Sequence, residues 1–216
     1  MQDPAHLSLT ERRKAETRME IARAAAGLFV RRGLRATRAE DIAQAAGIAP
    51  RTFYRYFATK EEAVAPLYAA GARRWAEAVR SAPASLSVPE ALEHAVRHTL
   101  TPGDGVSAAS WEWVRTLIHL ADASPALRKV WAEVCQSSDQ LLTSILAERT
   151  GASGEAAAAP PARLRFAAAV AGAAVRVAVE SWASGTAAPT GPEGPAALAL
   201  QNLAALREFA WEGPGA

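Results

Sequence analysis

The segment that most constrains the fold covers residues 37–57 and has two helix-start signals on either side of one glycine. Thr37 and Glu40 have the spacing of a capping box, in which two residues satisfy backbone N–H groups at a helix start. Gly47 lacks a β-carbon and permits a sharp turn, and Pro50 fits the first turn of a helix without the loss of a hydrogen bond. The segment therefore predicts two short helices joined by a turn of about three residues.

Helical spacing of apolar residues recurs along the rest of the chain, and no segment alternates apolar and polar residues as a half-buried strand does. The first helix is expected to begin at Ser8 or Thr10 and to end at Gly33. Thr59 opens another capping box, and Pro66 is expected to bend the helix that follows. The expected helices span about residues 10–32, 38–45, 50–57, 59–80, 88–101, 107–121, 125–149, 162–184 and 195–212. The predicted fold class is all-α, with about nine helices.

Positive charge is concentrated near the N-terminus. Residues 1–60 contain twelve Lys and Arg against six Asp and Glu, whereas the remaining residues contain twelve against sixteen. This asymmetry favours an anionic partner for the first part of the chain. The single cysteine, Cys135, permits no internal disulfide and is expected to be a buried helix residue in a reducing compartment. Charges throughout the first thirty residues and the shortness of the longest apolar run, residues 167–175, predict a soluble cytoplasmic chain with no membrane partner.

Two short helices around a tight turn, flanked by longer helices and by an excess of positive charge, have the layout of a helix-turn-helix reader. In such a reader the second short helix enters the major groove of DNA. If Phe53 and Phe57, four residues apart, face the core, then Arg51, Tyr54 and Arg55 point outward. The sequence pattern and a DNA-reading role therefore agree.

Residues 39–60, AEDIAQAAGIAPRTFYRYFATK, resemble the DNA-binding signature of the TetR family of regulators, and residues 22–33, ARAAAGLFVRRG, extend the match. The resemblance implies a helix-turn-helix DNA-binding domain, residues 1–58, with three helices. It also implies a C-terminal helical bundle domain for ligand binding and dimerisation, residues 59–216. The stretch PRTFYRYF further resembles an actinobacterial subgroup whose C-terminal domain is called acyl-CoA-like or mycofactocin-regulator-like.

The resemblance also implies a set of DNA contacts. Thr37 and Lys60 are expected at phosphates, Tyr54 and Tyr56 at the backbone or bases, and Arg51 and Thr52 nearest the base edges, with Arg38 and Arg55 as further candidates. Many family members have Ser or Thr where this chain has Ala49, which cannot cap the recognition helix through its side chain. Arg12, Arg13 and Lys14 either form a basic arm on the DNA or are solvated, and both interpretations stay open.

Aromatic and polar residues lie in the segments that enclose the ligand cavity in the resembling family. The candidate ligand contacts are Trp75, Trp111, Trp113, Arg115, His119, Trp131 and Arg176. Aromatic residues at helical spacing are more often core packing than cavity wall. Glu180, one turn from Arg176, offers that arginine a simpler partner than a ligand.

The predicted function is that of a homodimeric transcriptional regulator, a repressor released from a palindromic double-stranded operator by a small hydrophobic or amphipathic effector. The alanine-rich residues 167–179 and the helix ending near Trp211 resemble the family's dimer interface. Effector binding would tilt the helix bent at Pro66 and change the spacing of the two readers. The alternative is a helical small-molecule carrier or interaction module with a vestigial reader. The histidines are scattered, and the pair His94 and His98 lacks a third zinc ligand, so no enzyme, metal or cofactor is expected.

Overall fold

The structure is a computed structural model that describes residues 8–103, 108–151 and 161–206. All regular elements within these residues are helices, which confirms the predicted all-α class. The N-terminal helices are α1 (Leu9–Arg32), α2 (Ala39–Ala45) and α3 (Pro50–Tyr56), followed by a short 3-10 helix, η2 (Glu62–Val64). The C-terminal helices are α4 (Ala65–Ser81), α5 (Val88–Leu100), α6 (Ala108–Ala123), α7 (Pro125–Arg149), α9 (Ala162–Ser184) and α10 (Pro195–Ala204).

Helix α1 begins and ends on the local signals in its sequence. The Ser8 hydroxyl accepts the Glu11 N–H at 3.2 Å and the Glu11 carboxylate accepts the Ser8 N–H at 2.9 Å, so the start is at Ser8 and not at Thr10. Gly33 ends the helix with φ +80°, and its N–H donates to the Phe29 carbonyl at 2.9 Å. Leu34 then packs against the core, as expected for this kind of helix end.

The start of α2 differs from the predicted capping box. Arg38, not Thr37, precedes the helix, and the Arg38 N–H donates to the Asp41 carboxylate at 2.8 Å. The Thr37 side chain is fully buried, and its hydroxyl donates to the Gly33 carbonyl at 2.9 Å instead of capping α2. The turn between α2 and α3 covers residues 46–49, and Gly47 within it has φ +67°.

The capping box expected at Thr59 precedes the 3-10 helix η2 rather than an α-helix, and one of its two hydrogen bonds involves Ala58. The Thr59 hydroxyl accepts the Glu62 N–H at 3.2 Å, and the Glu62 carboxylate accepts the Ala58 N–H at 3.0 Å. The α-helical path begins only at Ala65, which places Pro66 in the first turn of α4. A proline there displaces no hydrogen bond, so the predicted bend at Pro66 is wrong.

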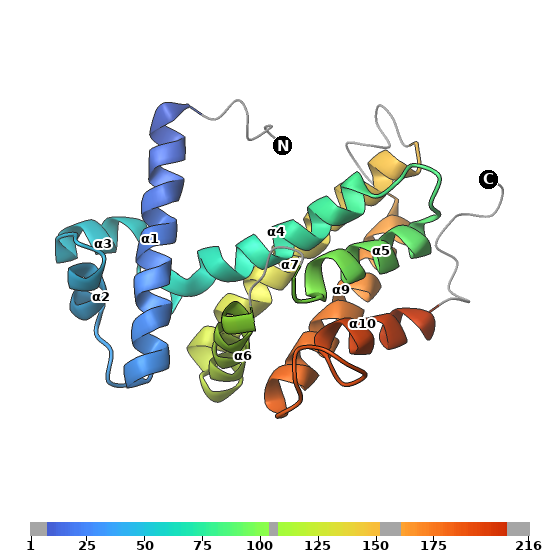
Figure 1. The fold of residues 1–216 in the computed structure, drawn as a ribbon. Coiled ribbons are helices and arrows are strands. Elements are labelled where there is room, and N and C mark those ends of the chain that lie inside the picture. The colour runs from blue at the N-terminus through green and yellow to red at the C-terminus, as the bar shows by residue number, and fades with distance from the viewer. Residues whose placement is uncertain (1–7, 104–107, 152–160, 207–216) are drawn as a thin grey trace.

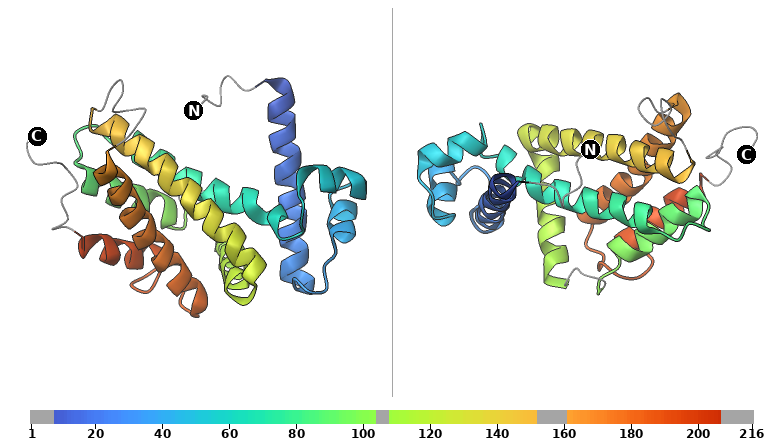
Figure 2. Two further views of the ribbon diagram at one scale, coloured as in Figure 1. Left: turned by 180° about the vertical axis from the view of Figure 1, so that it is seen from behind. Right: turned by 90° about the horizontal axis from the view of Figure 1, so that it is seen from above.

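Helices α1 to α3 form one end of the molecule, and α4 leads from them to the far end of the C-terminal domain (Figure 1). There α4 packs along α7, α9 packs on α7 and α10, and α6 lies between α1 and α9. Figure 2 shows the same separation from behind and from above. The amide of Asn202 on α10 donates to the Ala174 carbonyl on α9 at 2.9 Å and fixes this pair of helices.

The last helix is shorter than the sequence predicted. The last helix, predicted to residue 212, ends at Ala204 in the structure, and Trp211 lies outside the described residues. Within residues 8–103, 108–151 and 161–206, no helix is long and apolar enough to cross a membrane.

Candidate nucleic-acid interface and candidate ligand cavity

Helix α3 is oriented by its two phenylalanines. Phe53 is 0% and Phe57 3% exposed, and their rings pack 5.9 Å apart between centroids. This anchoring turns Arg51, Tyr54 and Arg55 to the surface, and Tyr54 is 52% exposed. The outward orientation predicted from the sequence is therefore confirmed for these three side chains.

The exposed face of α3 continues onto α2. Arg38 is exposed at the start of α2, and Thr52 is half-buried at the start of α3. We call Arg38, Arg51, Thr52, Tyr54 and Arg55 the recognition surface. Ala49 makes no side-chain hydrogen bond at the start of α3, as expected, and Pro50 occupies the first turn.

The two tyrosines of α3 differ in their surroundings. The Tyr54 hydroxyl donates to the Glu40 carboxylate on α2 at 3.2 Å, which links the two short helices across their exposed face. Local desolvation, followed by the charge of Glu40, raises the pKa of Tyr54. Tyr56 is half-buried, and its carbonyl accepts a hydrogen bond from the Arg18 guanidinium at 2.9 Å. Tyr56 thus offers only part of its ring to a partner.

Two residues predicted to contact phosphates make hydrogen bonds within the domain. The Thr37 side chain is 0% exposed and its hydroxyl donates to the Gly33 carbonyl, so it presents no surface to a phosphate. The Lys60 ammonium donates to the carbonyls of Leu34 at 2.7 Å and Thr37 at 2.8 Å. Lys60 therefore ties the residue 33–37 turn to the segment after α3, with one N–H donor left over.

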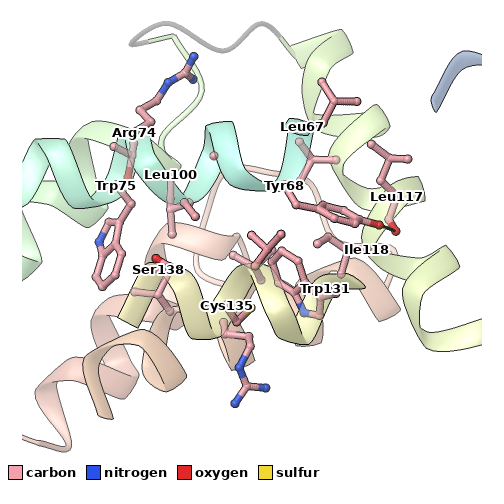
Figure 3. Close-up of a pocket in the computed structure, with 18 of the residues that line it drawn as sticks. Leu67, Tyr68, Arg74, Trp75, Leu100, Leu117, Ile118, Trp131, Cys135 and Ser138 are labelled. Atoms are coloured by element: carbon pink, nitrogen blue, oxygen red, sulfur yellow. Dashed lines mark hydrogen bonds between the residues drawn. The ribbon is translucent and has the colours of Figure 1, made fainter. Parts of the chain in front are cut away.

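A cavity of about 640 Å³ lies in the C-terminal domain between α4 and α7 (Figure 3). Its walls also include side chains of α1, α5, α6 and α9. Most are apolar or aromatic, and they include Ala26, Leu67, Tyr68, Trp75, Leu100, Trp111, Val114, Leu117, Ile118, Trp131, Val134, Val175 and Val179. The volume and the apolar lining are those of a small-molecule site.

Five of the seven candidate ligand contacts line this cavity, namely Trp75, Trp111, Trp113, Trp131 and Arg176. Arg115 does not, because its guanidinium lies 4.3 Å from the centroid of the Trp182 ring and donates to the Ala187 carbonyl. His119 does not either, because it projects from α6 into solvent. The structure thus corrects the prediction for these two residues.

The hydrogen bonds around the aromatic wall run from helix to helix. The Tyr68 hydroxyl on α4 donates to the Leu117 carbonyl on α6 at 2.7 Å, and burial raises the pKa of Tyr68. Tyr68 packs edge to face against Trp131, with 5.1 Å between ring centroids. The Trp131 indole N–H donates to the Glu180 carboxylate at 2.6 Å, and Glu180 pairs with Arg176 at 3.3 Å. The pairing of Arg176 with Glu180, foreseen from their spacing, is confirmed.

Residues Tyr68, Cys135, Ser138 and Asp139 were absent from the predicted contacts although they line the cavity. Residues 131, 134, 135, 138 and 139 share one face of α7, and a helical projection from Trp131 would have found this face. Cys135 was expected to be buried but is only partly buried, at the cavity wall. Desolvation raises the pKa of its thiol to about 12, which disfavours the reactive thiolate.

Metal binding receives no support from the described part of the chain, where no three His, Cys, Asp or Glu residues are grouped as ligands. His94 and His98, the pair with zinc-like spacing, both project into solvent from α5.

The described residues form helices throughout, with a helix-turn-helix at one end and a largely apolar cavity of about 640 Å³ among α1, α4, α5, α6, α7 and α9. Residues 21–65 match the model for bacterial regulatory proteins of the tetR family, and residues 86–200 match the MftR C-terminal domain. The chain belongs to the TetR family of transcriptional regulators.

Curated relatives agree with this assignment. The HTH-type transcriptional regulator TcmR of Streptomyces glaucescens is 30% identical over 66% of this chain and 64% of its own length. The repressor KstR2 of Mycobacterium tuberculosis is 51% identical over 22% of this chain and 24% of its own length. The chain thus matches less than two thirds of each relative. Both relatives are named as HTH-type transcriptional regulators, in agreement with the tetR-family match.

Solved structures share the fold at lower identity. Thermus thermophilus FadR, a TetR-family repressor solved with lauroyl-CoA, has 24% identity and a TM-score of 0.55 over 92% of this chain and 97% of its own. Salmonella enterica GusR has 17% identity and a TM-score of 0.55 over 90% and 95% of the two chains.

Proposed function

We propose that this regulator is a homodimeric repressor that leaves a palindromic operator when a small hydrophobic or amphipathic effector fills the cavity. The observation that carries the proposal is the position of α1. This helix packs against α2, and its residues Arg23 and Ala26 also line the cavity. An effector in the cavity therefore touches the DNA-binding domain itself. Such a regulator acts in the cytoplasm, in keeping with the free thiol of Cys135.

Coupling to DNA would run through α1 and α4 rather than through a bend at Pro66. Helix α4 follows η2 directly and carries Tyr68 and Trp75 into the cavity wall. A ligand that prefers one position of α1 and α4 shifts the population toward that position, in proportion to its differential affinity.

The recognition surface would read base edges and phosphates in the major groove. Arg51 and Arg55 supply charged donors for guanine edges or phosphates, and Tyr54 lies between them. Arg38 and Lys60 would contact the flanking phosphates. Thr37 is excluded from this proposed set because it is buried.

Dimerisation would use the outer face of α9. Val170, Ala173 and Val177 recur on one face of this helix, and Val177 is 45% exposed. The alanines on the opposite side of α9, such as Ala171 and Ala178, are buried against other helices of the same chain.

Light scattering of size-exclusion peaks tests the dimer. Val177→Asp should shift the mass from dimer to monomer, because a carboxylate would be desolvated at the interface. Leu9→Asp is a control, since Leu9 on α1 is also an exposed apolar residue, and this variant should stay dimeric. A wild-type monomer contradicts this part of the proposal.

DNA titrations test the reader. Fluorescence anisotropy with duplexes selected from a random pool should show affinity that falls steeply with salt, because phosphate neutralisation releases counterions. Arg51→Ala should weaken binding by about 10- to 100-fold. The control Arg97→Ala removes an exposed arginine of α5 and should keep wild-type affinity. A response that is flat with salt, or equal losses in both variants, contradicts the proposal.

A further inference from the structure

The cavity contains one carboxylate without a partner. Asp139 on α7 lines the cavity, and within the described residues no hydrogen bond or ion pair reaches its carboxylate oxygens. Burial raises the pKa of Asp139 to about 6, and the charge of Arg176 opposes that rise only in part. Asp139 is therefore ionised at neutral pH at a site where its negative charge is poorly solvated.

The fold makes room for this carboxylate. A β-carbon at Gly172 on α9 would overlap Oδ1 of Asp139, so the acid lies directly against the bare α-carbon of that glycine. Gly172 has an ordinary helical backbone and needs no glycine for its own conformation. The absence of a side chain at Gly172 thus leaves the space that the Asp139 carboxylate occupies.

The cations near the cavity offset the charge of Asp139 only in part. The charge of Arg176 lowers the pKa of Asp139, but Arg176 forms its ion pair with Glu180, which also accepts the Trp131 N–H. Arg74 projects away from the cavity in Figure 3 and is exposed. Arg23 is exposed as well. On the groove between α7 and α9 that adjoins Asp139, Arg128 and Asp122 add one charge of each sign.

The cavity walls are aromatic on both sides. Ser138, next to Asp139 on α7, lies near Trp75 in Figure 3, whereas Tyr68 and Trp131 meet edge to face toward the other side of the same space. Aromatic faces attract cations as well as flat apolar rings. A negative group among aromatic rings favours a positive ligand over a neutral or negative one.

Resting on the proposed function, we propose that the effector is an aromatic amine whose protonated nitrogen binds the Asp139 carboxylate while its ring system packs among Tyr68, Trp75 and Trp131. A neutral apolar ligand would fill the same volume but leave the acid unpaired. An anionic ligand would meet the charge of Asp139 directly.

Calorimetric titration with three naphthalene probes tests this inference. The probes are 1-naphthylmethylamine, 1-naphthalenemethanol and 1-naphthoate, which share one ring system and differ in charge. At pH 7.5 the amine should bind about 10-fold more tightly than the alcohol, as expected for one charge-assisted hydrogen bond. The carboxylate should bind most weakly.

Substitutions test whether the preference for the amine over the alcohol depends on Asp139. Asp139→Asn keeps the shape and should bring the amine to the affinity of the alcohol. Gly172→Ala should also reduce the preference, because the new methyl group displaces the acid. The control Glu133→Gln removes an exposed carboxylate on the same helix and should preserve the preference. Circular dichroism checks that each variant is folded.

Four results overturn the inference: no binding of any probe, equal affinity of amine and alcohol, tightest binding of the carboxylate, or a preference that survives Asp139→Asn. DNA binding is measured separately without probe. Loss of DNA binding with an intact amine preference would refute the proposed function and leave this inference standing. Normal DNA binding without a preference for the amine would refute this inference and leave the proposed function standing.

Discussion

The recognition surface and the cavity differ in how their residues are brought together. The recognition surface comes from two short helices that are adjacent in sequence, and its side chains point into solvent with few partners. The cavity is lined by six helices, from α1 to α9. Several groups around it bond to one another, as Tyr68 does to Leu117 and Trp131 to Glu180, whereas the buried indole N–H groups of Trp75 and Trp111 have no partner among the described residues. Charged side chains on an exposed surface stay solvated and can remain unpaired until a charged polymer binds. Charged groups inside a protein are either paired or carry the free-energy cost of desolvation.

The charged groups around the cavity differ in their pairing. Arg176 and Glu180 pair with each other, whereas no hydrogen bond or ion pair from the described residues reaches the Asp139 carboxylate. Unpaired charges in the two regions therefore lie where an external partner would bind, with positive charge on the outside and negative charge on the inside. The following variants separate these two regions, from the largest expected effect to the smallest.

The largest effect is expected for Phe53→Ala. Phe53 is completely buried at the centre of the helix-turn-helix, and truncation of such a phenylalanine destabilises a fold by about 3–5 kcal/mol. Urea denaturation followed by circular dichroism measures the loss. The surface neighbour Tyr54→Ala should change stability by less than about 0.5 kcal/mol. Similar losses for both would mean that α3 is not anchored through this ring.

Gly47→Ala tests the turn alone. The glycine has φ +67°, and a β-carbon there would meet no atom within 4 Å, so the expected penalty is purely conformational. A non-glycine residue in this region is about 1–2 kcal/mol less stable. Thermal denaturation measures it, with Gly71→Ala as a control because Gly71 lies in a helix and has equally open space. Unchanged stability of Gly47→Ala would show that the turn relaxes.

Tyr68→Phe removes one hydrogen bond from the cavity wall and retains the ring. Loss of the bond to the Leu117 carbonyl should destabilise the chain by about 1 kcal/mol, the usual net value of a buried hydrogen bond. DNA affinity without effector should stay at the wild-type level, because the recognition surface is untouched. A large drop in that affinity would instead show that the cavity wall sets the position of α1 even when no ligand is present.

Asp139→Asn should stabilise the chain slightly at neutral pH. The folded pKa of about 6 lies above the ordinary value of 3.8 for an aspartate, so the folded state binds the proton more tightly and ionisation of Asp139 opposes folding. This penalty is fully present above pH 6 and disappears as the pH falls toward 4. The gain should be roughly 1 kcal/mol at pH 7.5, after allowance for solvent screening of a half-buried group. Melting temperatures across this pH range measure it, and a gain that persists at pH 4 contradicts the assignment to Asp139.

The sequence by itself determined the helices, most of their ends and the outward face of α3. These features depend on neighbours within one or two turns, such as Ser8 with Glu11, Gly33 after α1, and Phe53 with Phe57. Local signals failed where a competing partner was close in space. Thr37 bonds back to Gly33, and Pro66 follows a 3-10 turn that the pattern did not distinguish from a longer α-helix.

Only the tertiary structure decided the cavity. Tyr68 reaches Leu117 and Trp131 reaches Glu180 across 49 residues of sequence in each case, and Arg115 stacks on Trp182 instead of facing a ligand. The meeting of Asp139 with Gly172 likewise depends on the distance between α7 and α9. Such contacts are set by how helices pack, and helical spacing along one segment fixes a face but not the helix opposite it.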